Sequence, residues 1–480
     1  MSTGKHSENI GIQGSDASIV GHGACPRSFL EKAILPGNTN IPTGDIPTCN
    51  RAGTSKLAAK EWRAKCMSKA SIPSGYTYLA QLMGHDLGNN VPLSAVPCIT
   101  PNQRSEAETY GTYNLNENPL SLETIYAKGA LGTPHLYEPK RLMFRIAPGR
   151  KLSDKMELPT ESGTNDQNIR EQRLLADQRN LDTVMLHQLA VVWMQFHNLV
   201  ARTFIAQDYP NERNLSREYY FGIFAKARAI VLHTWHTIIF EDLLPVFCHP
   251  KALALSECVL ESTHLLSDVD ALHGIMRAFH ALPLAEYELE EEQRHSLMDI
   301  QNPANETKWI INWSFFFGSN AINKTALSAS YSPHLIGISG NAIALADLSS
   351  ARKMGALSGF SDPIKIARKR LPPALRNDLS ARHLASLLNK AAGAGPKGIV
   401  TEAEISRIPL FLLLMIEAQF YGENGGFGPF GSVLLRRYLL HTKNKINYIA
   451  PRRSLPGDWP QPKTMLDVIN IVQTYGNKGN

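Results

Sequence analysis

The stretch Gly75 to Asn90, GYTYLAQLMGHDLGNN, places a histidine and an aspartate side by side, at His85 and Asp86. Its apolar residues otherwise recur at helical spacing, so the pair interrupts a face suited to a core. An imidazole can take up and return a proton near neutral pH. A histidine within an apolar helix is more often structural, however, so this pair alone defines no site.

Two further pairs lie one helical turn apart. Arg179 and Asp182 are three residues apart at the start of a long helical pattern, where a surface ion pair is the ordinary interpretation. Arg277 and His280 share one turn of an otherwise apolar segment. A buried histidine can bind a metal centre axially while the arginine meets an anionic group attached to that centre. Haem, with one iron and two propionates, has this arrangement, so haem binding is one possibility.

A zinc site is not favoured. His233 and His236 lie three apart in HTWH, but the HExxH pattern and a nearby third ligand are missing. We therefore interpret both histidines as packing and hydrogen-bonding residues.

Composition indicates an ordinary globular protein with a large core. The 480 residues are 43% hydrophobic and 19% charged, and the net charge of +6 is not concentrated in basic runs, so nucleic-acid binding is not expected. Six cysteines are scattered without a CxxC pair, which suits a reducing compartment. The N-terminus has no apolar signal region, and the longest apolar run, Pro409 to Ile416, is too short to span a bilayer. We expect a cytoplasmic protein without a transmembrane segment.

The elements that must position these pairs are helices. Residues 1–55 are rich in Gly, Pro, Ser and Asn and predict an extended N-terminal arm, and residues 91–170 predict irregular connections with short helices. Alternating Val-, Ile- and Tyr-rich segments are nearly absent, so we expect a mainly α fold with one large domain over residues 56–480. The predicted helices are Lys56–Ala70, Gly75–Asn90, Arg173–Gln207, Arg217–Leu244, Ser267–Ala281, Ala374–Ala392 and a pair within Pro409–His441, divided by a turn at Gly422–Gly431.

The order and spacing of these motifs resemble the peroxidase–cyclooxygenase superfamily, the animal-type haem peroxidases, and especially their bacterial branch. GYTY with Gln81, His85 and Asp86 resembles the distal helix, and DQRNLD at Asp177–Asp182 resembles the motif that carries the catalytic arginine. His197–Asn198 follows at the family's distance, and RAFHALPLAEY at Arg277–Tyr287 resembles the proximal motif. Weaker matches at Ala392–Gly398 and Glu417–Gly431 extend the resemblance over residues 70–475.

The resemblance implies a role for each motif residue around a haem b group. His85 is similar to the distal histidine that acts as base and then acid. Arg179 would stabilise the charge that develops as the O–O bond breaks, and Gln81 would hydrogen-bond a ligand or water at the iron. His280 would be the proximal iron ligand, and Arg277 a partner of a haem propionate.

The family's distal aspartate binds calcium in many members. The resemblance places the corresponding ligands at Asp86, Glu117, Ser121 and Glu123, since oxygen ligands suit Ca²⁺. Ser121 replaces an acid and Glu123 a shorter side chain, so the retention of calcium is left open.

Other departures bear on haem attachment and on the proximal side. Gly84 stands where many animal members carry an ester-forming aspartate, so that link cannot form. Asp182 replaces the usual glutamate with a shorter side chain that could in principle form the other ester to the haem. For the asparagine that accepts from the proximal imidazole, an ungapped count gives Ser386 and a three-residue deletion gives Asn389. We prefer Asn389 because its amide oxygen can accept the imidazole N–H.

Fatty-acid cyclooxygenase chemistry is not favoured, because Arg277 stands where those relatives have a radical-forming tyrosine. Nothing singles out Tyr76, Tyr78 or Tyr287 as a substitute. The resemblance implies a peroxidase that reduces hydrogen peroxide through an oxo-ferryl intermediate and oxidises a small organic donor. The alternative is a dedicated biosynthetic haem oxygenase or dioxygenase that uses dioxygen on one small-molecule substrate. A haem-binding scaffold without turnover is a third class, which the presence of both His85 and Arg179 argues against.

Overall fold

The structure is a computed structural model that describes residues 59–92, 112–146, 175–209, 215–302, 309, 311–335, 343–396, 398–446 and 461–476, with Leu30, Ile34 and Leu35. The expected N-terminal arm therefore lies outside the described residues except at these last three positions. All three are buried, and the carbonyl oxygen of Ile34 accepts from the backbone N–H of Tyr331 at 2.8 Å. This short piece of the arm packs on the helical core.

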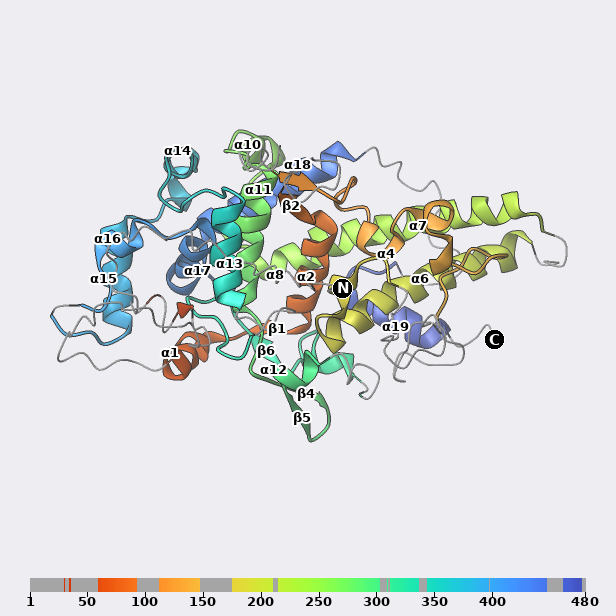
Figure 1. The fold of residues 1–480 in the computed structure, drawn as a ribbon, viewed down its shortest axis with the longest axis horizontal. Helices are drawn as coiled ribbons and strands as arrows, with labels where there is room; N and C mark the ends of the chain where they lie inside the picture. The colour runs from red at the N-terminus through yellow and green to blue at the C-terminus, as the bar shows by residue number, and fades with distance from the viewer. Residues whose placement is uncertain are drawn as a thin grey trace, which may run out of the picture.

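The described part is built mainly of helices, which confirms the predicted mainly α class (Figure 1). Most of the long helices bury an apolar face in one shared core. The helices are α1 (Ala59–Cys66), α2 (Gly75–Leu87), α4 (Glu123–Tyr126), α5 (Gly129–Gly132), α6 (Val184–Asp208), α7 (Arg217–Thr237), α8 (Leu244–Phe247), α9 (Pro250–Leu253), α10 (Glu257–Glu261), α11 (Asp268–Asp270), α12 (Leu297–Ile300), α13 (Ile343–Lys353), α14 (Asp362–Arg370), α15 (Ala381–Ala391), α16 (Glu402–Ile405), α17 (Leu410–Tyr421), α18 (Pro429–Lys445) and α19 (Met465–Tyr475).

Strands are short and form no extended sheet within the described residues, as the sequence predicts. Each strand pairs with one antiparallel partner. The pairs are β1 (Ile72–Pro73) with β6 (Lys324–Thr325), β2 (Asn90–Pro92) with β3 (Thr112–Asn114), and β4 (Glu286–Glu290) with β5 (Gln293–Ser296).

Helix α2 stands near the centre of the molecule (Figure 1). It packs against α6 and against the proximal segment, the stretch that carries Arg277 and His280. Helix α6 begins at Val184, eleven residues after the predicted start at Arg173. Thr183 caps it by accepting from the backbone N–H of Leu186 at 3.2 Å, and the polar residues before it form the 3₁₀ turn η6 (Gln178–Leu181). Arg179 therefore lies before the helix, in a turn that packs against α2.

Helix α7 lies beside α6 and continues through the π turn η8 (Ile238–Leu243) into α8. Among the described residues, the stretch Arg217–Phe247 is long and apolar enough to cross a membrane, and 67% of its most apolar window is buried inside the protein. Burial of that extent is also typical of a core helix.

The proximal segment is not one regular helix, although the sequence predicts one over Ser267–Ala281. It passes from α11 through the π turn η9 (Ala271–Ile275) into the 3₁₀ turn η10 (Met276–Ala281). Side chains three apart eclipse one another in a 3₁₀ helix, so Arg277 and His280 lie on the same side. Helices α13 and α17 pack against this segment.

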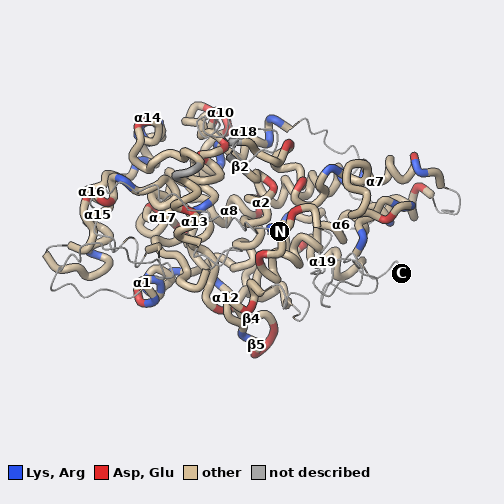
Figure 2. Tube along the Cα trace, viewed as in Figure 1, with Lys and Arg blue, Asp and Glu red and all other residues tan. Residues whose placement is uncertain are grey.

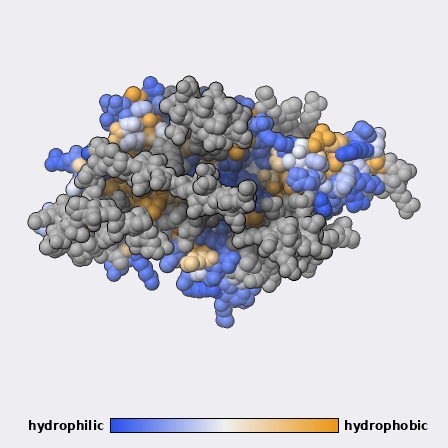
Figure 3. Space-filling view, in the orientation of Figure 1, coloured by the Kyte–Doolittle hydropathy of each residue, from blue (hydrophilic) through white to orange (hydrophobic). Residues whose placement is uncertain are grey.

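The C-terminal helices include four that the sequence analysis did not predict, α13, α14, α16 and α19. The predicted division of Pro409–His441 is present, with α17 ending at Tyr421 and α18 beginning at Pro429. Where Figure 3 colours the surface, hydrophilic residues alternate with separate apolar patches. Lys and Arg are interspersed with Asp and Glu along the described chain in Figure 2.

Candidate active site

One face of α2 is open while the rest of the helix is buried. Gln81, Gly84 and His85 are partly exposed, whereas most other residues of this helix are buried. Positions three and four apart share a helix face, so the open face carries an amide, a gap and an imidazole. A Cβ at Gly84 would meet only the Met276 methyl group, at 3.4 Å. The absence of a side chain at Gly84 therefore leaves space on this face between α2 and Met276.

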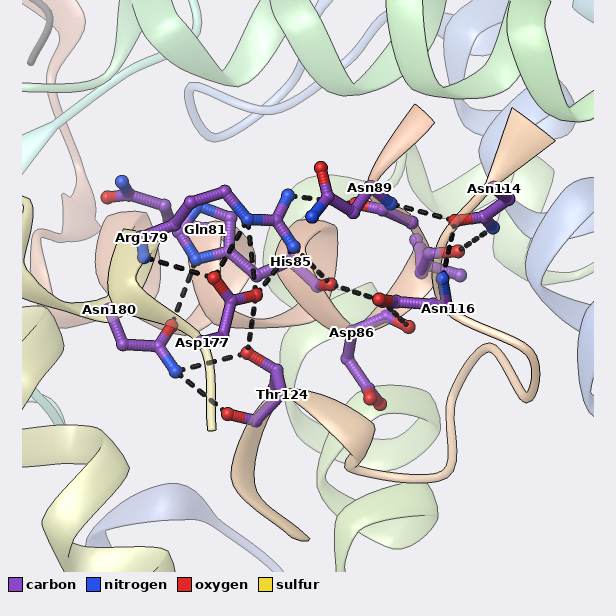
Figure 4. Close-up of polar contacts among 12 residues, drawn as sticks. Gln81, His85, Asp86, Asn89, Asn114, Asn116, Thr124, Asp177, Arg179 and Asn180 are labelled. Carbon is purple, nitrogen blue, oxygen red and sulfur yellow. Dashed lines mark hydrogen bonds and ion pairs between the residues drawn. The ribbon is translucent and has the colours of Figure 1, made fainter. Parts of the chain in front are cut away.

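The His85 imidazole is held from one side by a neutral amide (Figure 4). Its Nδ1 lies 2.9 Å from Oδ1 of Asn180, whose own Nδ2 donates to the carbonyl and hydroxyl oxygens of Thr124 at 3.1 and 3.0 Å. Because the Asn180 oxygen can only accept, we infer that Nδ1 carries the proton and that Nε2 is the basic nitrogen. Burial, reinforced by the charge of Arg179, lowers the pKa of His85 to about 4. The imidazole is neutral at pH 7 and can serve as a base.

Arg179 is clamped beside α2. Its Nε lies 3.0 Å from Oδ1 of Asp177 and its Nη2 lies 2.6 Å from Oδ2, and the same guanidinium donates to the carbonyl oxygens of Gly88 and His85 at 2.9 and 3.0 Å (Figure 4). Its side chain stays 28% exposed. Burial opposes ionisation of Asp177, but the hydrogen bonds and charge of Arg179 outweigh it and hold the pKa of that carboxyl below its usual range. The result is a fixed cation whose charge is shared with a carboxylate.

Sequence reasoning gave Asp177 no role. The signal was present in the motif itself, since an acid two residues before an arginine can accept from both its backbone and its side chain. Here Asp177 does both, with Oδ1 also 3.0 Å from the backbone nitrogen of Arg179.

Gln81 and Asp182 meet at the same face. The amide Nε2 of Gln81 donates to Oδ2 of Asp182 at 3.1 Å. The other oxygen, Oδ1, is buried and has no hydrogen-bond partner among the described residues. Burial raises the pKa of Asp182 to about 6. This carboxyl is therefore a second titratable group beside His85.

On the proximal side, His280 is held by a carboxylate. Its Nδ1 lies 2.7 Å from Oδ2 of Asp347, which also accepts from the Tyr331 hydroxyl at 2.7 Å, while Nη1 of Arg277 lies 3.1 Å from Oδ1. Asp347 is fully buried, and burial opposes its ionisation. The electrostatic interaction with His280 and Arg277 and these hydrogen bonds outweigh that effect and hold the pKa of Asp347 below its usual range. Since Nδ1 of His280 donates to the carboxylate, its Nε2 is the nitrogen available to a metal.

The expected contact between Asn389 and His280 is corrected by the structure. The Asn389 amide accepts from the backbone nitrogens of Ile399 and Val400 at 2.8 and 2.9 Å and donates to the Val400 carbonyl at 2.8 Å. It fastens the loop after α15 and is not the partner of His280, whose Nδ1 meets Asp347.

The other counted position, Ser386, is exposed on α15. Asp347 was missed because no helix was predicted around it. Its signal lies in the pattern of α13, where Ala344, Asp347 and Ala351 share the buried face. A carboxylate on such a face requires a partner.

The elements that carry His85 and His280 adjoin. Helix α2 packs against η10, and a Cβ at Gly84 would lie 3.4 Å from the methyl group of Met276. His85, His280, Arg179 and Arg277 are all partly exposed although their elements lie in the core. Two imidazoles with free Nε2 atoms, two guanidiniums and the gap at Gly84 form a donor set that fits a haem group.

The calcium ligands implied by the resemblance are engaged otherwise. Nζ of Lys128 lies 2.9 Å from Glu117 and 3.5 Å from Glu123, and Ser121 donates its hydroxyl to the carbonyl of Asn118 at 2.5 Å. Within the described ranges no group of three or more His, Cys, Asp or Glu could hold a metal ion. The exposed ammonium of Lys128 therefore pairs with two of the four residues that the resemblance offers as calcium ligands.

Asp86 faces away from the open face of α2 (Figure 4). Its Oδ2 accepts from the backbone nitrogen of Leu122 and from Nε1 of Trp235, both at 3.0 Å. Burial raises its pKa to about 7. Asp86 ties α2 to the loop before α4 and to α7.

Comparisons with known proteins show the fold. No protein-family model matches the sequence, and no curated protein matches it. Among solved structures, peroxidase A from Dictyostelium discoideum is similar with a TM-score of 0.52 and 14% identity, over 86% of this chain and 88% of that one. A fatty acid α-dioxygenase from Oryza sativa is similar with a TM-score of 0.50 and 11% identity, over 86% of this chain and 75% of that one.

Proposed function

We propose that this chain is a haem-binding oxidoreductase that reduces hydrogen peroxide and oxidises a small organic donor. The observation that carries the proposal is the pair of imidazoles, His85 and His280, at one partly exposed site. Each donates its Nδ1 proton to a buried acceptor and so presents Nε2 toward the site. The fold is similar to that of a peroxidase, which supports the same class of enzyme.

Haem b would be held through Nε2 of His280. When bound, it supplies the electron-transfer chemistry that no side chain in the site can supply. Arg277 is expected to meet a haem propionate, and 30% of its side chain is exposed although one Nη atom pairs with Asp347. No carboxylate replaces the ester-forming acid at Gly84, so haem would be retained chiefly by His280 and by packing.

The distal residues would handle the protons. Nε2 of neutral His85 accepts the proton that peroxide loses on binding and returns it to the oxygen that leaves. Arg179, fixed by Asp177 and two carbonyl oxygens, holds positive charge next to that reaction and needs no reorganisation. Gln81 can donate its second amide proton to a ligand while Asp182 fixes its orientation.

The proximal carboxylate favours peroxidase chemistry over the dioxygenase alternative. Asp347 draws on the Nδ1 proton of His280 and so raises the electron-donating power of Nε2, which assists cleavage of a peroxide bond. The alternative rests on the similarity to the fatty acid α-dioxygenase fold. A peroxidase should oxidise generic phenols with peroxide, whereas a dioxygenase should consume dioxygen with its own substrate, for which a saturated fatty acid is a suitable first probe.

The test is rapid-mixing absorption spectroscopy of the haem-loaded protein with hydrogen peroxide and then guaiacol. We expect a shift of the Soret band that reverses as the phenol is oxidised. A His85→Ala variant should bind haem yet react slowly, and His233→Ala, which removes an exposed histidine, should react like the wild type. Haem-loaded protein that does not react with hydrogen peroxide but consumes dioxygen with a fatty acid would overturn the peroxidase proposal in favour of the alternative.

A further inference from the structure

A buried arginine of α1, to which the sequence analysis gave no role, holds the chain just after His280. Arg63 is 7% exposed. Its Nη2 donates to the carbonyl oxygens of Ala281 and Pro283 at 3.1 and 2.6 Å, and its Nη1 donates to the carbonyl oxygen of Ser330 at 2.7 Å. One guanidinium therefore joins the turn that carries His280 to a segment almost fifty residues farther along the chain.

The end of η10 depends on donors from outside the turn. Carbonyl groups at and beyond the end of a helical turn have no partner within it and must find one elsewhere. Here Arg63 supplies two of the partners, and the Thr325 hydroxyl donates to the carbonyl oxygen of Leu282 at 2.5 Å. The three successive carbonyl groups that follow His280 are therefore held, two of them by one side chain.

Arg63 is a cation in the core without an anion beside it. Among the described residues its hydrogen-bond acceptors are neutral carbonyl groups. Burial lowers its pKa to about 10, so it stays charged at neutral pH. A cation buried without an anionic partner has a large desolvation cost. A guanidinium is, however, a rigid planar set of donors, so it can fix both segments in one geometry.

Helix α1 is itself anchored beside the same segment. Nε1 of Trp62 donates to the carbonyl oxygen of Ala329 at 2.7 Å, one residue before Ser330, and Trp62 is 1% exposed. The guanidinium of Arg63 thus projects from a helix that is fixed at the adjoining residue. A side chain that positions another segment needs such an anchor.

We propose that Arg63 is a positioning residue for His280, which keeps the turn after this histidine in place and so keeps Nε2 directed toward the site. The inference rests on the proposed function, because this position matters to the chemistry only if His280 binds a haem iron. The hydrogen bonds of Arg63 go to backbone carbonyl groups, so it acts through the backbone. Helix α1 precedes residues 70–475, over which the motifs of the sequence analysis run, so no motif assigns this role.

The experiment is resonance Raman spectroscopy of the reduced, haem-loaded protein, in which the stretching band of the iron–imidazole bond reports how the axial ligand is held. One variant is Arg63→Lys, whose ammonium is a single point and cannot serve carbonyl groups on both segments. The other is Arg63→Ala, with and without added methylguanidinium. We expect one narrow band in the wild type, a shifted or broadened band in both variants, and recovery of the wild-type band when methylguanidinium fills the gap in Arg63→Ala.

Haem affinity should fall in parallel, by about 10-fold in Arg63→Lys, the lower end of the effect of residues that orient a metal ligand. Arg368→Lys is the matched control. Arg368 also donates to a backbone carbonyl group, that of Leu379 at 2.6 Å, but outside the turn at His280. This variant should keep the wild-type band and affinity.

Hydrogen–deuterium exchange of the haem-free protein supplies an independent readout. The backbone N–H of Leu284, which donates to the Tyr287 hydroxyl at 2.8 Å, lies at the end of the held turn. Its exchange should be faster in Arg63→Lys and unchanged in Arg368→Lys. A misfolded variant would instead exchange faster throughout the chain. If Arg63→Ala fails to fold, Arg63→Lys, which keeps the charge and most of the side chain, carries the test.

A wild-type band and wild-type haem affinity in the folded Arg63 variants would overturn the inference, even with faster exchange at Leu284, because Arg63 would then support the fold alone. Failure of methylguanidinium to restore the band in folded Arg63→Ala would also count against it. A wild type that shows no iron–imidazole band would refute the proposed function instead, and this inference with it.

Discussion

The two histidines of the site are held by different partners, and the difference separates their tasks. His85 donates to the neutral amide of Asn180, whereas His280 donates to the carboxylate of Asp347. An amide fixes the tautomer without adding negative charge, so burial and the charge of Arg179 keep the pKa of His85 low, at about 4. A carboxylate fixes the same tautomer and raises the basicity of the opposite nitrogen. A proton shuttle needs the first arrangement, and a metal ligand benefits from the second.

The supporting elements differ in the same way. The distal partner comes from η6, a polar turn next in space to α2, and is locked by Thr124. The proximal partner comes from α13, 67 residues after His280 in the chain. Asn180 lies 95 residues after His85, but it stands beside Arg179 in a motif that the sequence analysis singled out. Asp347 belongs to no such motif and meets His280 only through the packing of α13.

Removal of the distal imidazole should have the largest effect on rate. We expect His85→Ala to lower the rate constant for reaction with peroxide by about 10²–10⁴, the usual contribution of general acid–base catalysis. Haem binding should persist because the ligand is His280. Stopped-flow absorption measures the rate, with His233→Ala as the control for loss of a histidine. An unchanged rate would remove His85 from the reaction.

Neutralisation of the proximal carboxylate should have the next largest effect. In Asp347→Asn the amide can still accept from His280 but carries no charge, so haem affinity or peroxide reactivity should fall by about 10–100-fold. Haem titration and stopped-flow absorption measure the two quantities. Asp378→Asn, which changes an exposed aspartate, is the matched control. Equal behaviour of the two variants would show that the carboxylate does not tune His280.

Exchange of the distal amide for an acid should make the distal pair resemble the proximal one. Since protonated His85 cannot accept a proton, the wild-type rate should stay level below neutral pH and fall only as the pH drops through about 4. Asn180→Asp places a negative charge beside the imidazole, and the acid limb should move up by about one to three pH units. The pH dependence of the peroxide reaction measures both limbs. Identical profiles would mean that His85 is not the titrating group.

Loss of the Lys128 ion pairs should give the smallest effect on stability. Because Lys128 takes the acids that calcium would need, addition of Ca²⁺ or a chelator should not change the Tm of the wild type. Lys128→Gln breaks exposed ion pairs, so stability should fall by no more than about 1 kcal/mol. Calorimetric scans with and without Ca²⁺ measure both. A chelator-induced drop in the wild-type Tm would contradict the assignment.

Local patterns were enough to predict part of the site. The helical spacing around His85 and the turn that joins Arg277 to His280 are properties of short segments. In the structure Arg277 and His280 both meet Asp347, and α2 packs against their turn. The mainly α fold followed from the same periodicity. The start of the long helix could not be placed in that way, because Thr183 caps α6 eleven residues after the predicted start.

The partners of these residues depend on tertiary packing. Asn389 was chosen by counting within a motif, whereas the carboxylate that meets His280 comes from α13. The calcium ligands were also transferred by position, and Lys128, five residues after Glu123, neutralises two of them. In both cases the deciding side chain lay outside the motif.

The most direct test of the account is a haem titration of the wild type, His280→Ala and His85→Ala, followed by the Soret band and by the spin-state spectrum of the iron. We predict that the wild type and His85→Ala each bind one haem through an axial imidazole, and that His280→Ala loses this ligation. Identical ligation and affinity in His280→Ala, or no haem uptake by the wild type, would contradict the assignment of His280 and the function built on it.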